Sequence, residues 1–373
     1  MGSPSIIIVG AGPAGLAVGA RLRKMGIDFD MVEQGTSVAP SWHNHYERLH
    51  LHTVKEYSSL PFMPFPSGYP TYVSRQQLTD YLIDYASEFE ISPRFNTQVQ
   101  SVERAADKWI LSTTGEKMSA DRVVLATGIN RVPLTPSWPG LDSFTGTVVH
   151  SRDYRTANPF ENKRCLVVGM GNTGAEIALD LAESGIAVAI SVRGPVNIVP
   201  RDAFGRPTQQ TAIHLSGLPL WLQDALAKLT QKLTIGNLSK FGLRTPSIAP
   251  TAQLRRFGKT PVIDLGTVKQ IREGNIVIRP EIKRFTQAGV EFADGRVDDF
   301  DAVIICTGYK SGVTDIFPAV APYTDEYGNP TIVIGKESVD GAYFIGFDNY
   351  RAGGVLGIIN TDSKIIADHL GGV

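Results

Sequence analysis

A short apolar run that passes into a helix through three spaced glycines stands near the N-terminus and constrains the fold more than any other feature. Residues 6–9 are all apolar, and the glycines follow at the spacing G-x-G-x-x-G: Gly10, Gly12 and Gly15. At such a turn the first glycine allows the tight bend, the second lets a pyrophosphate approach the backbone, and the third lets the helix pack closely on the strand. Glu33 ends the next apolar strand, about 20 residues further on, where a carboxylate can accept hydrogen bonds from a ribose diol. We therefore predict a site for an adenine dinucleotide.

A second strand-turn-helix pattern begins at Cys165. It repeats the spacing, with an asparagine at the start of the expected helix: Gly169, Gly171, Asn172 and Gly174. The strand that follows, residues 188–192, contains Ser191 and ends in Arg193, where the first pattern ends in an acid. A guanidinium suits a 2′-phosphate through a charge-assisted contact, which favours NADPH over NADH at this turn. An exposed loop arginine without a ligand is the alternative that the sequence leaves open.

Two dinucleotide patterns with opposite ribose chemistry predict FAD at the first turn and NADPH at the second. The predicted fold class is α/β, with two Rossmann-like dinucleotide-binding domains and the NADPH domain inserted into the FAD domain. We place the FAD domain at residues 1–155 and 291–373, and the NADPH domain at residues 156–290. An aromatic segment after Glu33 and two strands that end in Thr-Gly are expected to return to a cofactor. Their cofactor-contacting residues are Trp42, Thr127, Gly128, Thr307, Gly308 and Tyr309.

Charge and composition exclude several classes of protein. The 373 residues are 42% apolar and 20% charged with a formal net charge of −1, so we expect an ordinary globular protein without a nucleic-acid footprint. No apolar run approaches the roughly 20 residues of a bilayer span, and the opening strand lacks the flanks of a signal peptide. We expect a cytoplasmic protein, monomer or homodimer, without stable membrane insertion, whose ligands are small molecules.

The two cysteines exclude one class of flavoprotein. Cys165 and Cys306 each lie in an apolar, strand-like run, where a cysteine behaves as a small buried hydrophobic residue. No Cys-x-x-Cys or Cys-x4-Cys pair occurs, so the dithiol of a flavin disulfide reductase is missing. A reductase that passes electrons to a disulfide or carrier protein is therefore disfavoured. A sensor that binds both nucleotides without turnover is a third alternative.

Two further segments each allow two interpretations. Four of the seven histidines fall within residues 43–52 without a carboxylate or cysteine at a ligand-like offset, so we expect no metal and interpret the segment as a wall of the cofactor and substrate pocket. Residues 213–233 form the one long amphipathic helix that the sequence predicts. Its leucine stripe is interpreted as a core face or pocket wall, with membrane contact as the alternative.

A more specific string lies between the two glycine turns. Residues 144–154 fit the pattern F-x-G-x-x-x-H-x-x-x-Y, and this string resembles the signature of class B flavin monooxygenases. Within that class the chain most resembles the YUCCA-type indole-3-pyruvate monooxygenases of auxin biosynthesis. The stretches that carry this resemblance are residues 46–52, 60–66, 258–267, 290–292 and 302–311, whereas residues 204–243 and 347–358 depart from the family pattern.

The resemblance implies an oxygenation in which NADPH reduces FAD and O2 forms a C4a-(hydro)peroxyflavin that delivers one oxygen atom. Indole-3-pyruvate or a related aryl 2-oxo acid would yield the corresponding acetic acid. Asn130 and His52 are expected to hold the oxygenated flavin, although His52 also fits a buried histidine of the core. Arg351 is the cation expected to bind the substrate carboxylate. Within the class, oxygenation of a soft nitrogen or sulfur centre is the alternative, and it needs no cation.

Overall fold

The computed structural model of the chain describes residues 5–351 and 353–372, which form two compact units. Of the described chain, the first unit contains residues 5–44, 53–132 and 309–372, and the second contains residues 45–52 and 133–308. The sequence placed the changes of domain after residues 155 and 290. In the structure the chain changes unit at 132/133 and at 308/309, because strands from both flanks of the expected NADPH domain complete the sheet of the second unit.

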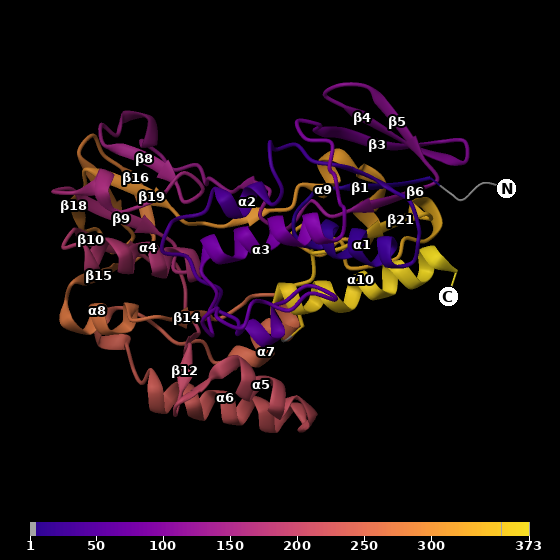
Figure 1. The fold of residues 1–373 in the computed structure, drawn as a ribbon. Helices are drawn as coiled ribbons and strands as arrows, with labels where there is room; N and C mark the ends of the chain where they lie inside the picture. The colour runs from indigo at the N-terminus through magenta and orange to yellow at the C-terminus, as the bar shows by residue number, and fades with distance from the viewer. Residues whose placement is uncertain (1–4, 352, 373) are drawn as a thin grey trace. The chain divides into compact units, whose positions relative to one another are not determined.

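The first unit is built on a parallel sheet that carries the first glycine turn. Its strands lie in the order β2 (Asp30–Val32), β1 (Ile6–Val9), β6 (Arg122–Leu125) and β21 (Ala342–Phe344). All side chains of β1 are buried, as an unbroken apolar run predicts for a strand that is covered on both faces. Helices α1 (Pro13–Lys24) and α10 (Val355–Gly371) pack against each other in this unit (Figure 1).

A capped helix and a small antiparallel sheet complete the first unit. Helix α3 (Arg75–Glu88) begins after the N-cap Ser74, whose hydroxyl accepts a hydrogen bond from Gln77 N, while the Gln77 side chain accepts one from Ser74 N. The antiparallel sheet consists of β3 (Val99–Ala105), β4 (Lys108–Thr113) and β5 (Lys117–Ala120). The short elements are α2 (Pro40–His43), α9 (Val313–Ile316) and the 3-10 turns Lys55–Tyr57, Pro318–Tyr323 and Glu337–Val339. The chain changes unit within or beside β7 (Val132–Pro133) and β20 (Tyr309–Lys310).

The second unit has a parallel sheet of five described strands that carries the second glycine turn. The order is β15 (Ile276–Arg279), β10 (Ala187–Ser191), β9 (Arg164–Val168), β19 (Ala302–Ile305) and β8 (Thr147–His150). Helix α4 (Asn172–Glu183) follows β9, and α8 (Thr267–Glu273) packs beside it. Both predicted strand-turn-helix patterns are therefore confirmed, and the fold class is α/β with two Rossmann-like modules.

Smaller elements extend the second unit. A hairpin with its turn at Asp294 and Gly295 joins β17 (Gly289–Phe292) to β18 (Val297–Asp299), and β16 (Ile282–Phe285) pairs with β17. The other elements are β11 (Ile198–Pro200) paired with β14 (Val262–Asp264), β12 (Asp202–Ala203) paired with β13 (Arg206–Pro207), α7 (Pro250–Phe257), and the 3-10 turns Leu141–Ser143, Asn158–Phe160, Leu215–Gly217 and Ser239–Phe241.

The long helix predicted over residues 213–233 is two helices in the structure. Helix α5 (Thr208–His214) ends early, and α6 (Leu220–Thr234) begins after Pro219. Among the described residues of α6 only Gln231 is buried, and it donates hydrogen bonds to Asn197 Oδ1 and the Ile198 carbonyl. Leu229 and Leu233 are 53% and 66% exposed. The expectation of a core face was therefore wrong for the exposed leucines, because polar contacts of Gln231 hold the inner side of this helix, and the expectation of a pocket wall stays a prediction.

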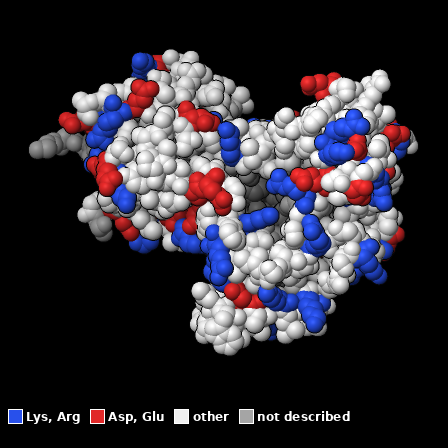
Figure 2. All heavy atoms as spheres, turned by 180° about the vertical axis from the view of Figure 1, so that it is seen from behind, with Lys and Arg blue, Asp and Glu red and all other residues white. Residues whose placement is uncertain are grey.

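The surface of the described chain carries both signs of charge. On the face shown in Figure 2, lysine and arginine side chains occur together with acidic ones, and uncharged areas lie between them. None of the helices that the structure describes combines the length and the apolarity that crossing a membrane requires.

Candidate active site

The first glycine turn has room for a ligand at one position only. Gly10 has a φ of +109°, and a Cβ on it would lie 2.6 Å from the Ala126 carbonyl oxygen. A Cβ on Gly15 would lie 2.0 Å from the Gly10 carbonyl oxygen, so both positions require glycine for the fold itself. Gly12 is different, because its φ of −80° suits any residue and its Cβ would meet no described atom within 4 Å. The open space beside Gly12 is where a pyrophosphate fits, at the N-terminus of α1.

The second glycine turn repeats this geometry. Gly169 has a φ of +102°, and its Cβ would lie 2.7 Å from the Cys306 carbonyl oxygen. A Cβ on Gly174 would lie 2.0 Å from the Gly169 carbonyl oxygen. Gly171 has a φ of −89°, and again no described atom lies within 4 Å of its Cβ position. The Thr-Gly strand end therefore lies beside the glycine turn in each unit, and its expected contact with a cofactor stays a prediction.

Glu33 is held firmly at the first turn. Its Oε2 accepts a hydrogen bond of 2.8 Å from Ala11 N, its Oε1 accepts one of 2.8 Å from Gly35 N, and the residue is only 6% exposed. Each carboxylate oxygen keeps a second lone pair that a ribose hydroxyl could use. The buried hydroxyl of Thr127 has no hydrogen-bond partner among the described residues. An orphaned donor beside an open glycine turn fits a bound FAD.

The predicted NADPH contacts divide into one exposed group and several occupied ones. Arg193 is exposed, so its guanidinium is accessible to a phosphate. Ser191 is buried and donates a hydrogen bond of 2.8 Å to the Pro280 carbonyl. Asn172 Oδ1 accepts from Ile263 N at 2.7 Å, which ties the start of α4 to β14. The Thr307 hydroxyl donates to the Leu134 carbonyl. The roles of these residues toward a nucleotide stay predictions, and Arg193 has the strongest geometric support.

Three other residues of the first unit that were predicted to contact a cofactor are half-buried or exposed. Trp42, in α2, is half-buried, and Tyr309, in β20, is half-buried as well. Asn130 is exposed two residues beyond Gly128, which has a φ of +77° and closes the Thr-Gly turn. Their positions are compatible with flavin contact, and their roles stay predictions.

Arg351 is engaged by two carboxylates of the first unit. Its Nε donates to Asp348, and its Nη2 lies 2.7 Å from both oxygens of Asp362, which is 2% exposed. Burial raises the pKa of Asp362, and the Arg351 guanidinium counteracts that shift. A substrate carboxylate would have to share this guanidinium with two acids. The role of Arg351 toward a substrate stays a prediction.

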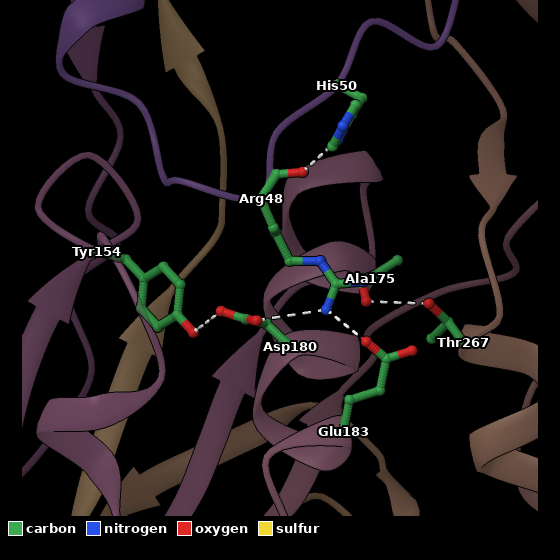
Figure 3. A network of polar contacts seen from close by, with 7 residues as sticks. All are labelled: Arg48, His50, Tyr154, Ala175, Asp180, Glu183 and Thr267. Atoms are coloured by element: carbon green, nitrogen blue, oxygen red, sulfur yellow. Dashed lines mark hydrogen bonds and ion pairs between the residues drawn. The ribbon is translucent and has the colours of Figure 1, made fainter. Parts of the chain in front are cut away.

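A strap formed by residues 45–52 lies along α4 in the second unit (Figure 3). Arg48 Nη1 lies 3.3 Å from Asp180 and 2.8 Å from Glu183, and Glu47 N donates to the Arg155 carbonyl at 3.0 Å. The same region holds the last residue of the 144–154 signature, because the Tyr154 hydroxyl donates to Asp180 Oδ2 at 2.6 Å. Burial, together with this hydrogen bond, raises the pKa of Tyr154. The signature tyrosine therefore helps to anchor the strap.

His52, at the end of the strap, meets a residue that sequence reasoning missed. Its Nε2 contacts the Oε1 atom of Glu176, which lies on α4 and has a side chain only 2% exposed. Burial and the charge of Glu176 raise the pKa of the neighbouring Tyr46 phenol. Glu176, Asp180 and Glu183 follow the second glycine turn at the spacing i, i+4, i+7 of one helix face. This spacing of acidic residues, together with Arg48 in the strap, was the sequence signal that could have predicted the contact between the strap and α4.

Comparisons with known proteins agree with this arrangement. A family model described as flavin-binding monooxygenase-like matches residues 32–320. The Arabidopsis thaliana protein named probable indole-3-pyruvate monooxygenase YUCCA9 is 41% identical over 316 residues, which are 82% of this chain and 75% of the relative. The indole-3-pyruvate monooxygenase YUCCA1 of Oryza sativa subsp. japonica is 39% identical over 83% of this chain and 78% of its own length. The resemblance read from the sequence is confirmed.

A solved structure shares the fold. The flavin-containing monooxygenase from Stenotrophomonas maltophilia superposes with a TM-score of 0.76 at 21% identity, and the match covers 99% of this chain and 98% of that chain. At this identity the likeness concerns the fold alone. It agrees with the α/β architecture of the two units.

Proposed function

The chain belongs to the flavin-binding monooxygenase-like family, and from this premise we propose that it oxidatively decarboxylates an aryl 2-oxo acid such as indole-3-pyruvate. The protein is an NADPH-dependent flavin monooxygenase with FAD and NADPH as cofactors. The single observation that supports the proposed substrate is the 39–41% identity to relatives named for indole-3-pyruvate, over four-fifths of the chain. Both glycine turns that such a reaction requires are intact in this chain.

The proposed reaction balances with the two cofactors and O2. The 2-oxo acid, O2, NADPH and one proton give the shortened carboxylic acid, CO2, NADP+ and water. The bond between the keto carbon and the carboxylate breaks, and one oxygen atom of O2 enters the new carboxyl group. The flavin, when bound, supplies electron transfer from NADPH to O2 and the delivery of that atom. The chain must bind and orient the reactants and exclude water.

Each unit has its own proposed task. In the first unit, the space beside Gly12 and the fixed carboxylate of Glu33 would hold the FAD pyrophosphate and ribose. In the second, the space beside Gly171 and the exposed Arg193 would hold NADPH. His52 is the proposed group that positions the reacting centre, because the strap and Glu176 hold its ring in place. Asn130 is the other residue proposed to hold the oxygenated flavin.

Arg351 favours one alternative substrate class. Because Asp348 and Asp362 already bind the Arg351 guanidinium, a substrate carboxylate would have to compete with them for its charge. A neutral soft nucleophile, such as an amine or a sulfide, needs no such cation. Nitrogen or sulfur oxygenation is therefore the second candidate.

A coupling assay tests the proposed substrate. The purified holoenzyme is given NADPH, O2 and catalase, together with indole-3-pyruvate, phenylpyruvate, a tertiary amine or a thioether. Catalase is included because free hydrogen peroxide decarboxylates 2-oxo acids by itself. We expect one acetic acid product for each NADPH with an aryl 2-oxo acid. Product from the amine or thioether alone would replace the proposed substrate by the second candidate.

A further inference from the structure

We propose that Glu176 is a positioning residue that fixes the orientation and the tautomer of His52. The proposal adds a residue that neither sequence reasoning nor the comparisons assign. Its catalytic consequence rests on the proposed function of His52. The contact itself is a feature of the second unit and can be tested without any substrate.

The contact joins an almost fully buried acid to a partly exposed ring. The Glu176 side chain is 2% exposed and the His52 side chain is 20% exposed, and their contact atoms are Oε1 and Nε2. A carboxylate can only accept, so Nε2 carries a proton and Nδ1 is the nitrogen left for another partner. Among the described residues His52 Nδ1 makes no hydrogen bond. The ring therefore has a defined orientation and a defined free nitrogen.

The strap would be anchored without Glu176, which argues against a merely structural role. Arg48 already binds Asp180 and Glu183, and the Tyr154 hydroxyl adds a further bond to Asp180. Besides His52, Glu176 faces the phenol of Tyr46, which also belongs to the strap and whose pKa is raised by burial and by the Glu176 charge. Its second oxygen, Oε2, is buried without a hydrogen-bond partner at close distance among the described residues. Such an atom costs stability, so anchoring the strap is not a sufficient explanation for this carboxylate. An acid that serves the ring of His52 accounts for its placement.

Glu176 also ties His52 to the nucleotide module. It lies two residues after Gly174, within the same helix whose first turn faces the open space beside Gly171. A rigid helix therefore carries both the expected anion site and the acid that sets the imidazole. Glu176 therefore fixes His52 to the helix of the NADPH module. In the sequence, the strap lies between two segments of the first unit.

The test compares two glutamate variants of the same helix. Glu176→Gln keeps the shape, but its amide offers a donor as well as an acceptor, so either tautomer of His52 can form. Glu183→Gln is the matched control, because it removes the negative charge from one strap contact on the same face and does not touch the histidine. Protein labelled with 15N-histidine reports the tautomer directly, and the His52 signals are those that disappear in His52→Asn.

We expect one tautomer of His52 in the wild type and in Glu183→Gln, and a mixture of tautomers in Glu176→Gln. With a coupled substrate, kcat for product should fall at least about tenfold in Glu176→Gln, while the rate of flavin reduction by NADPH and the substrate KM change less than about twofold. Unchanged tautomer signals in Glu176→Gln would overturn the proposal, and so would equal losses of product in both variants. If no 2-oxo acid couples in the wild type, the proposed function fails, and the nitrogen spectra still decide the role of Glu176.

Discussion

The two glycine turns have nearly the same backbone and differ in what ends the next strand. Both have a glycine at a φ near +105° packed on a strand that ends in Thr-Gly, and both leave open space at the middle glycine. In the first, Glu33 is buried and held by two backbone N–H groups. In the second, Ser191 is tied to a carbonyl and Arg193 is exposed. On the proposed assignment, the turn provides a pyrophosphate site in each unit, and the end of the next strand would select the nucleotide.

The largest expected effect separates the two sites completely. Gly12→Val should give folded, colourless protein, and Gly171→Val should give yellow protein that NADPH no longer reduces. Both positions have ordinary φ values and open surroundings, so the valine side chain would displace the ligand without displacing protein atoms. Flavin absorbance and stopped-flow reduction measure the two losses. Full flavin content in Gly12→Val, or normal reduction in Gly171→Val, would break the comparison.

A smaller effect concerns the selection of the nucleotide. Arg193→Ala removes a charge-assisted contact worth about 1.5 to 3 kcal/mol, so the KM for NADPH should rise roughly 10- to 150-fold. The KM for NADH should barely change, and flavin content should stay normal. Arg296→Ala, an exposed arginine in the β17–β18 hairpin, serves as the control. Similar losses with both nucleotides would mean that Arg193 does not read the 2′-phosphate.

Arg351 extends the comparison to an arginine that is already paired. Arg351→Gln leaves Asp362 buried without its partner, and should cost about 1 to 2 kcal/mol at pH 7, since the guanidinium is half-exposed. Burial raises the pKa of Asp362 above its unfolded value. Stability is then lost as pH rises from the unfolded-state pKa of Asp362 to its folded-state pKa. Removal of Arg351 raises the folded-state pKa of Asp362 further. Thermal unfolding at pH 5 and pH 7 should show the larger loss at pH 7. A pH-independent loss would contradict this account.

The smallest expected effect makes the two modules more alike. Cys306 precedes Thr307 as Ala126 precedes Thr127, and in both cases the backbone oxygen faces the glycine turn. Cys306→Ala should therefore leave the KM for NADPH within about twofold and cost only about 1 kcal/mol of stability.

Burial raises the pKa of the Cys165 and Cys306 thiols to about 12, so both should resist alkylation at pH 8 until the protein unfolds. Rapid labelling of native protein would contradict their burial.

The fold and both glycine turns could be predicted because each depends on local backbone requirements. Gly10 and Gly15 need the absence of a side chain, and that need is visible as spacing. The Glu176 contact could not be predicted in the same way, because it joins residues 124 positions apart in the sequence. Helix α6 was misread because its leucine stripe resembles a core face, whereas Gln231 supplies its inward contacts. The pairing of Arg351 with Asp362 could not be predicted either, because the two residues lie 11 positions apart in the sequence, and the role of Arg351 toward a substrate stays a prediction.

Isotope labelling tests the central claim that this chain uses both modules to place one atom of O2 into an organic substrate. The holoenzyme, with NADPH, indole-3-pyruvate and catalase, is placed under 18O2, and the acid product is examined by mass spectrometry. One 18O atom in each acetic acid product, with one CO2 released and one NADPH consumed, is the predicted result. Absence of labelled acid product in the presence of catalase, with the electrons of NADPH recovered as hydrogen peroxide in a parallel reaction without catalase, would contradict the claim.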